Sequence, residues 1–135
     1  KKQRVNMSIQ QTQDYYRERL ESLDFIEDSK AAEKITKAAL GILTSDLSDQ
    51  EAKEFTARLP DYLSYEVLRN HQIRPADRTP DEAVIVIAEQ FDLERDQAER
   101  AIRQVLSVTK EQASGEISQI AYELPPEWAI WIDKP

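Results

Sequence analysis

The chain has 135 residues, of which 40% are hydrophobic and 33% are charged, with only two glycines. This composition favours a helix-rich globular protein over a disordered chain or a turn-rich β protein. The formal net charge of -8 at pH 7 argues against nucleic acid or an anionic membrane as a partner, because both require clustered lysines and arginines. The absence of cysteine excludes disulfides, a thiol nucleophile and thiolate metal sites.

No segment of the sequence is expected to cross a membrane or to direct export. The longest apolar run, residues 83–88, is far shorter than the roughly 20 residues that span a bilayer. The polar N-terminus lacks the hydrophobic region of a signal peptide. These features predict a cytoplasmic protein.

The first part of the chain is expected to begin with a flexible lead-in and two helices. Residues 1–13 show no helical periodicity and form the predicted lead-in. A first helix is expected from Tyr16. The clearest helix covers Lys30–Asp46, where apolar residues recur every three or four positions and predict one face in the core and one in water. Asp28 or Ser29 is expected to cap it.

Two short helices are expected next. Ser48 and Glu51 have the spacing of a capping box, in which each side chain satisfies a free backbone amide, so a third helix is predicted to begin near Asp49. Pro60 suits the first position of a helix, which predicts a short fourth helix over about 60–68.

The second part of the chain is expected to start with a strong helix signal. Thr79 supplies an N-cap, Pro80 a first-position proline and Glu82 the carboxylate of a capping box. Val84–Ile87 would locally pass for a strand, but the apolar stripe that continues from the cap favours a buried helix. The remaining expected elements are amphipathic helices over about 96–110 and 114–124 and one or two hydrophobic turns after Pro126.

The two parts of the sequence are similar to each other. Ala32 aligns with Ala98 at an offset of 66 residues, and Leu59-Pro60 aligns with Leu124-Pro125 at an offset of 65. One residue lost from the loop between the paired helices reconciles the two offsets. The chain therefore contains a predicted internal repeat.

Two copies are too few to form a solenoid, and each unit is too small to be stable alone. We therefore predict an all-α fold in which two tandem pseudo-repeats of a three-to-four-helix unit pack into one helical bundle body. The predicted boundaries are 14–70 for the first repeat, 71–78 for a linker and 79–135 for the second repeat.

The repeated positions also match a known family. In the first copy they are 32–34, 38–40, Leu43, Leu47-Ser48, Glu51-Ala52, Phe55 and Leu59-Pro60, and in the second 81–82, Ala88, Leu93, 98–101, 105–106, 115–116 and Leu124-Pro125. With these residues the chain resembles the bacterial family catalogued as domain of unknown function 2267 over nearly everything after about Tyr15. The resemblance implies a helical fold that often carries the unit twice, and it brings no established activity. The second copy departs from the pattern at Thr109 and Ala113, where leucines are usual, so its inner face is expected to be thinner there.

The tryptophan-rich end is one candidate binding site. Trp128, Trp131 and Ile132 belong to a run that is apolar on every side, and a short terminal helix cannot bury all sides in its own small unit. Tryptophan is enriched at interfaces because it buries a large area at low conformational cost, so these three residues are a candidate partner-binding surface. Core packing against the other unit is the alternative.

The predicted linker is the other candidate site. Arg69, His71, Arg74 and Arg78 make it the one locally basic stretch of an acidic chain, and they are a candidate anion or pocket site. The alternative is that the arginines pair with carboxylates of the two units and that the histidine is an ordinary linker residue.

No catalytic pattern is found in the sequence. A single histidine cannot build a Ser-His-Asp triad or a two-histidine metal site. Two glycines cannot form a phosphate-binding loop, and no EF-hand or zinc pattern occurs, so we expect no cofactor and no metal. The leading hypothesis is a non-catalytic protein-protein interaction or regulatory module with a protein partner or self-association. The alternative is a small-molecule-binding or enzymatic bundle with a pocket between the two repeats.

Overall fold

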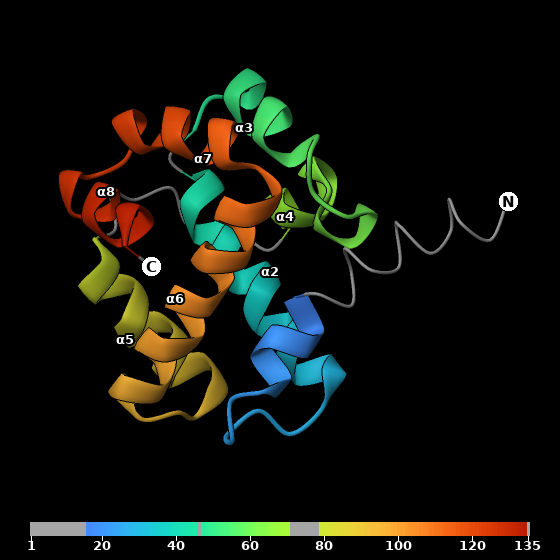
Figure 1. The fold of residues 1–135 in the computed structure, drawn as a ribbon, viewed down its shortest axis with the longest axis vertical. Helices are drawn as coiled ribbons and strands as arrows, with labels where there is room; N and C mark the ends of the chain where they lie inside the picture. Colours follow the sequence, from blue (N-terminus) through green and yellow to red (C-terminus); the bar gives the residue numbers. More distant parts are fainter. Residues whose placement is uncertain (1–15, 46, 71–78, 135) are drawn as a thin grey trace, which may run out of the picture.

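The computed structural model describes residues 16–45, 47–70 and 79–134, and every regular element in these ranges is helical (Figure 1). A helix at 16–21 comes first. The elements that follow are α2 (Ser29–Ser45), α3 (Asp49–Thr56), the 3-10 helix η1 (Asp61–Leu63), α4 (Tyr65–Asn70), α5 (Pro80–Phe91), α6 (Arg95–Gln112), α7 (Ser114–Ile120), the 3-10 helix η2 (Ala121–Glu123) and α8 (Pro126–Asp133). The predicted all-α class is confirmed. The predicted lead-in (1–13) and linker (71–78) lie outside the described residues.

Polar side chains begin three of the helices where the sequence predicts. The Ser48 hydroxyl accepts a hydrogen bond from the Glu51 N–H at 3.2 Å, and the Glu51 carboxylate accepts one from the Ser48 N–H at 3.1 Å. Thr79 and Glu82 make the same reciprocal pair at the start of α5. The Asp28 carboxylate accepts a first-turn backbone N–H of α2 at 2.9 Å. Both predicted capping boxes are therefore confirmed.

Two predicted helical segments, residues 84–87 and 60–68, differ in how well they agree with the structure. Val84–Ile87 lies inside α5, so the helix predicted there is confirmed. The single fourth helix predicted over 60–68 is wrong, because Ser64 has an extended backbone and separates η1 from α4. The Ser64 hydroxyl accepts a hydrogen bond from the Val67 N–H at 3.3 Å, which caps α4. Serine favours such local hydrogen bonds over a helix interior, so the chain ends one helix and starts another here.

Helix α2 is the central element of the core. Ten of its 17 residues are buried, and they include the four consecutive positions 38–41, which span a full helical turn. Burial therefore extends well beyond the single core face that the sequence predicts. Helices α4, α5 and α6 all pack against α2. The buried hydroxyls of Thr36, Thr44 and Ser45 donate to carbonyls of α2 itself, so they cost little in this apolar setting.

The first helix of each part of the chain packs against the long helix of the other part. Helix 16–21 makes hydrogen bonds to α6, and α5 packs on α2 as well as on its neighbour α6. The first half (residues 16–70) and the second half (79–134) thus interlock through these two helices. Apolar side chains from both halves form one core cluster.

A buried hydrogen bond joins helix 16–21 to α6. The hydroxyl oxygens of Tyr16 and Thr109 are 2.7 Å apart, and both residues are fully buried. Thr109 has one hydroxyl proton and donates it to the Val105 carbonyl at 2.8 Å. Tyr16 must therefore donate to Thr109. Burial of the Tyr16 phenol raises its pKa well above the ordinary value, although the hydrogen bond to Thr109 acts in the opposite direction.

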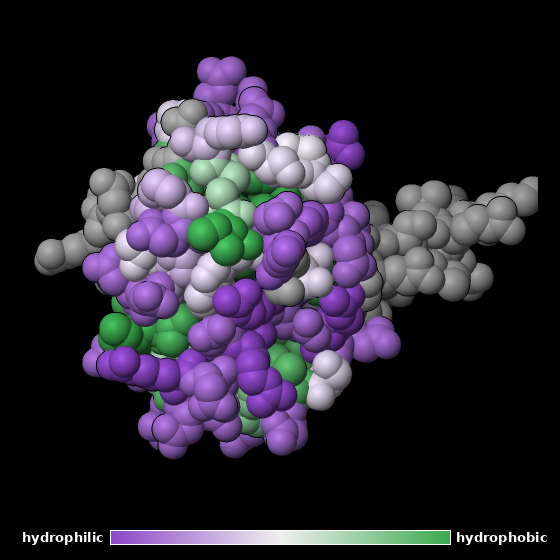
Figure 2. Space-filling model, turned by 60° about the vertical axis from the view of Figure 1, so that its left-hand side comes forward, coloured by the Kyte–Doolittle hydropathy of each residue, from purple (hydrophilic) through white to green (hydrophobic). Residues whose placement is uncertain are grey.

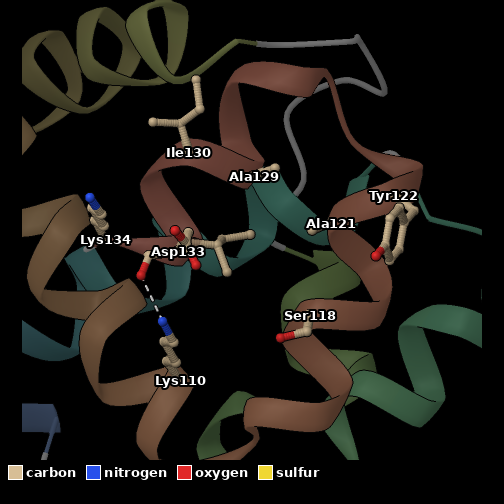
Figure 3. A pocket seen from close by; sticks show the side chains of 9 residues that line it. Lys110, Ser118, Ala121, Tyr122, Ala129, Ile130, Asp133 and Lys134 are labelled. Atoms are coloured by element: carbon tan, nitrogen blue, oxygen red, sulfur yellow. Dashed lines mark hydrogen bonds between the residues drawn. The ribbon is translucent and has the colours of Figure 1, made fainter.

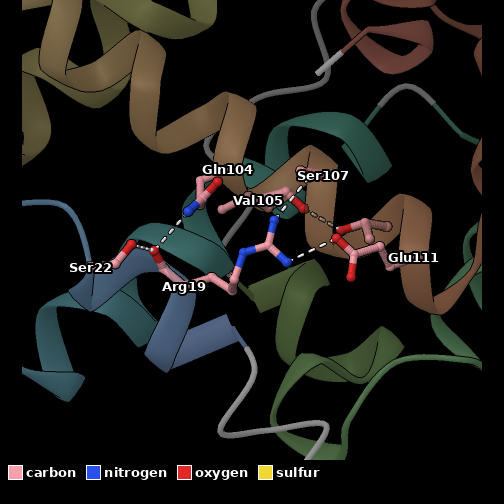
Figure 4. Close-up of polar contacts among 7 residues, drawn as sticks. Arg19, Ser22, Gln104, Val105, Ser107 and Glu111 are labelled. Carbon is pink, nitrogen blue, oxygen red and sulfur yellow. Dashed lines mark hydrogen bonds and ion pairs between the residues drawn. The ribbon is translucent and has the colours of Figure 1, made fainter.

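Further polar contacts join helix 16–21 to α6 near the surface (Figure 4). The Arg19 guanidinium donates to the Glu111 carboxylate at 2.8 Å and to the Ser107 hydroxyl at 3.1 Å. The Gln104 side-chain amide donates to the Arg19 carbonyl at 2.8 Å. Residues 104, 107 and 111 lie three and four positions apart, so they share one face of α6. Polar side chains therefore fix the register of helix 16–21 along α6.

A second polar cluster holds helix 16–21 to α2. The Glu33 carboxylate accepts a hydrogen bond from the Arg17 guanidinium at 2.9 Å and forms an ion pair with the Lys37 ammonium at 3.0 Å. Both cations lie over the Tyr62 ring, at 5.3 and 6.0 Å from its centroid. Burial alone would raise the pKa of Glu33, but hydrogen bonds from Lys37 and Arg17 outweigh it, and the pKa is lowered.

We predict that Tyr16 and Thr109 stabilise the fold as a coupled pair. Tyr16→Phe removes a donor and is expected to lower the free energy of unfolding by about 1 kcal/mol, and Thr109→Val strands the buried Tyr16 hydroxyl and is expected to cost about 1–3 kcal/mol. The double variant should lose less than the sum of the two. Urea unfolding followed by circular dichroism measures the cycle, and additivity within about 0.5 kcal/mol would show that the hydrogen bond is not a stabilising contact.

We also predict that the Glu33 cluster makes stability depend on pH. Because the folded pKa lies below the ordinary value of 4.5, the contribution is present above that pH and is lost as the pH falls through the folded pKa. Glu33→Gln should cost up to about 1 kcal/mol at neutral pH and nothing at low pH, since the side chains are partly exposed. Unfolding curves from pH 7 to pH 3 for this variant and for the control Glu89→Gln test it. A pH-independent deficit in Glu33→Gln contradicts it.

Candidate functional site

The final helix carries the tryptophans that the sequence singles out. Pro125 and Pro126 end the preceding element and start α8, with Pro126 at a position where its missing N–H costs nothing. Trp128 is 2% exposed and Ile132 is also buried, so both lie in the core. Trp131 is half-buried and meets Trp128 edge to face, with ring centroids 6.1 Å apart. Of the three predicted partner-binding residues, Trp131 is the most exposed.

Two cations of α6 fix the C-terminal end of α8. The Lys110 ammonium donates to the Asp133 carbonyl at 2.7 Å, and the Arg103 guanidinium donates to the Lys134 carbonyl at 3.4 Å. Arg103 also lies 4.0 Å from the centroid of the Trp131 ring. Positive groups at a helix C-terminus satisfy free carbonyls and complement the helix dipole. Helix α8 is therefore anchored both by its buried side chains and by its end.

The exposed apolar residues of this region are different from the predicted ones. Ile130 is 69% exposed and Tyr122 is 90% exposed. Both border an open hollow of about 640 Å³, within the size range of ligand sites. We call it the α8 hollow, and its lining residues are Lys110, Ser118, Ala121, Tyr122, Ala129, Ile130, Ile132, Asp133 and Lys134. A helical projection could have found Ile130, because a helix that buries positions 128 and 132 turns position 130 outward.

The charged residues that line the α8 hollow are two lysines and one aspartate. Lys110 extends from α6 toward the end of α8, and Ser118 faces the same space from α7 (Figure 3). Lys134 and Asp133 also belong to the lining and bring one charge of each sign. Figure 2 brings this side of the molecule forward and shows hydrophobic areas within a mostly hydrophilic surface. On a chain of net charge -8, the α8 hollow combines an apolar wall with two lysines and one aspartate.

Most of the predicted anion site lies outside the described residues. Arg69 belongs to α4, while His71, Arg74 and Arg78 lie outside the described residues.

A hollow between the two halves does occur elsewhere, with a volume of about 390 Å³. We call it the seam hollow, and its lining residues are Phe25, Ile26, Glu27, Ala31, Ile35, Phe91, Asp92, Leu93 and Gln97.

Within the described ranges, the acidic and basic groups show no arrangement typical of catalysis. The two groups with a clearly displaced pKa, Tyr16 and Glu33, both lie in structural contacts between helices. No cluster of three or more acidic, histidine or cysteine residues among the described positions could hold a metal ion. None of the described helices combines the length and apolarity needed to cross a membrane.

The described residues form an all-helical bundle whose surface carries one hollow beside α8 and others between the halves. The family model described as "Uncharacterized conserved protein (DUF2267)" matches residues 13–130, and the chain belongs to this family. Comparison with the curated proteins gives no match, and comparison with the solved structures gives none either.

We predict that buried and exposed residues of α8 contribute very differently to the free energy of unfolding. Trp128→Ala is expected to lower the free energy of unfolding by about 3–5 kcal/mol, because it leaves a cavity in the core. Ile130→Ala is expected to change it by less than about 0.5 kcal/mol. Thermal or urea unfolding compares the two variants, and losses of similar size would contradict the assignment of Trp128 to the core and Ile130 to the surface.

Proposed function

We propose that the chain is a non-catalytic protein-interaction module that binds its partner in the α8 hollow. The observation that carries this proposal is the exposure of Ile130 and Tyr122 on the borders of one hollow. Large apolar side chains that gather at a depression on a mostly hydrophilic surface mark interaction sites. Trp131, half-buried in the same helix, can add to the contact.

The partner that fits this surface is an amphipathic helix with acidic residues. Helix-in-groove recognition places apolar side chains of the partner in the hollow, here against Ile130 and Tyr122. The Lys110 ammonium is already held in place by the Asp133 carbonyl and has further N–H groups to donate. A carboxylate on the partner helix can therefore pair with Lys110 without reorganising the site.

The interaction module is proposed to consist of two copies of one helical unit, with boundaries at 14–70, 71–78 and 79–135. Positions of the helix starts support this proposal. Arg95 of α6 follows Ser29 of α2 by 66 residues, and Ser114 of α7 follows Asp49 of α3 by 65. Pro126 of α8 also follows Asp61 of η1 by 65 residues. These spacings equal the two offsets of the sequence alignment.

A bacterial cytoplasm is the proposed location, and a cysteine-free composition suits such a reducing compartment. The alternative function, binding of a small molecule between the halves, is favoured by one observation, the seam hollow.

Site-specific photo-cross-linking tests the proposed interaction. A benzophenone amino acid in place of Ile130 is expected to capture a partner whose cross-linked segment is an acidic amphipathic helix, while the same group in place of Ile85, exposed on α5, should not capture it. Capture at 130 should fall at least about tenfold in the background of Lys110→Glu, because an attraction becomes a repulsion. Equal capture from both positions, or a cross-linked segment without acidic residues, argues against the proposal.

A further inference from the structure

We propose that the seam hollow binds an organic ammonium ion, a positively charged nitrogen attached to an apolar body. This inference rests on the ligand-binding alternative and is independent of the α8 hollow. The shape, the apolar lining and the charge of the site indicate the class of ligand.

The seam hollow is built by the same kind of segment from each half. From the first half come the turn before α2 and its first two turns, and from the second half come the end of α5 and the turn that leads into α6. Ile26 and Ile35 are buried and form the apolar base. Phe25 and Phe91 are half-buried and contribute aromatic walls. A volume of about 390 Å³ suits a small molecule and is too small for a partner helix.

The charged groups of the seam hollow are all negative. Its lining includes the exposed carboxylates of Glu27 and Asp92, and it includes no lysine or arginine. No hydrogen bond or ion pair joins either carboxylate to another side chain in the described part of the chain. A cation that enters gains attraction from both carboxylates, and the net charge of -8 favours its approach. The site therefore favours a positively charged ligand.

The aromatic walls suit a cation that has an apolar body. Phenylalanine rings attract cations through their π faces, and this attraction is stronger for cations that are weakly hydrated. The Arg100 guanidinium lies 5.4 Å from the centroid of Phe25, so one face of this ring is already in contact with a cation of the chain itself. Arg100 itself does not line the hollow. An alkylammonium can place its nitrogen near the carboxylates and its chain against Ile26 and Ile35.

The end of α5 places the Asp92 carboxylate at the seam hollow. Asp92 ends α5 in the left-handed conformation, with φ 56° and ψ 51°. It is the one non-glycine residue with positive φ in the described ranges. Glycine is the usual residue at this position of a helix end, because it carries no side chain to strain the backbone. Aspartate keeps the same turn and adds a negative charge to the hollow.

The test is an NMR titration of the full chain with three probes of equal length at constant ionic strength. Hexylammonium is expected to shift the backbone amides of 25–35 and 91–97 saturably, with a dissociation constant on the order of 1 mM, because the site is open and its contacts are few. Hexanol should bind at least about tenfold more weakly, and hexanoate should cause no saturable shift in this region.

Variants separate the two carboxylates from the overall charge. Glu27→Gln with Asp92→Asn is expected to weaken hexylammonium binding about tenfold or more. The control pair Glu66→Gln with Glu89→Gln removes the same charge from exposed positions outside the hollow and should leave binding within about twofold. Asp92→Gly retains the turn and removes one carboxylate, so it should weaken binding without loss of stability.

Three results would overturn the proposal. They are the absence of saturable shifts up to about 10 mM hexylammonium, equal binding of hexanol, and equal weakening by the control pair. Because none of the variants touches α8, capture of a partner at Ile130 remains a separate measurement, and either proposal can fail without the other.

Discussion

The burial of α2 by elements of both halves is the constraint on which the rest of the structure depends. A helix that is apolar around a whole turn has to be covered on all sides, and the other helices of the first half are short. Helix α5 from the second half supplies part of the cover, and helix 16–21 in turn packs on α6. Each half therefore completes the core of the other. This arrangement explains why polar contacts such as Arg19 with Glu111 connect residues that are far apart in the sequence.

Much of the fold could be predicted from the sequence because it depends on local signals. The capping boxes at Ser48 and Thr79 are short-range patterns that specify a helix start by themselves. The same cap favours a helix at Val84–Ile87, where composition alone suggests a strand. Ser64 shows the limit of this approach, since a single side-chain hydrogen bond there divides one predicted helix into two elements.

The candidate sites could be predicted less well because exposure depends on what faces each residue in space. The resemblance in sequence predicts a thinner core around Thr109. The Tyr16 hydroxyl from the other half instead uses it as an acceptor, which only the tertiary arrangement reveals. Likewise, tryptophan is a residue type common at interfaces, but Trp128 fills the core. Ile130, two residues further along α8, lies at the surface instead. The seam hollow combines two turns that are 66 residues apart, so no local pattern could indicate it.

The interlocking of the two halves is tested most directly by cutting the chain in the predicted linker. Polypeptides 1–74 and 75–135 should each have low helix content by far-UV circular dichroism, because each lacks the helix that covers its long helix. An equimolar mixture should regain the helix content and the cooperative unfolding of the intact chain. Cooperative unfolding of either polypeptide alone, with a midpoint close to that of the intact chain, would show that the halves fold independently and would contradict this account.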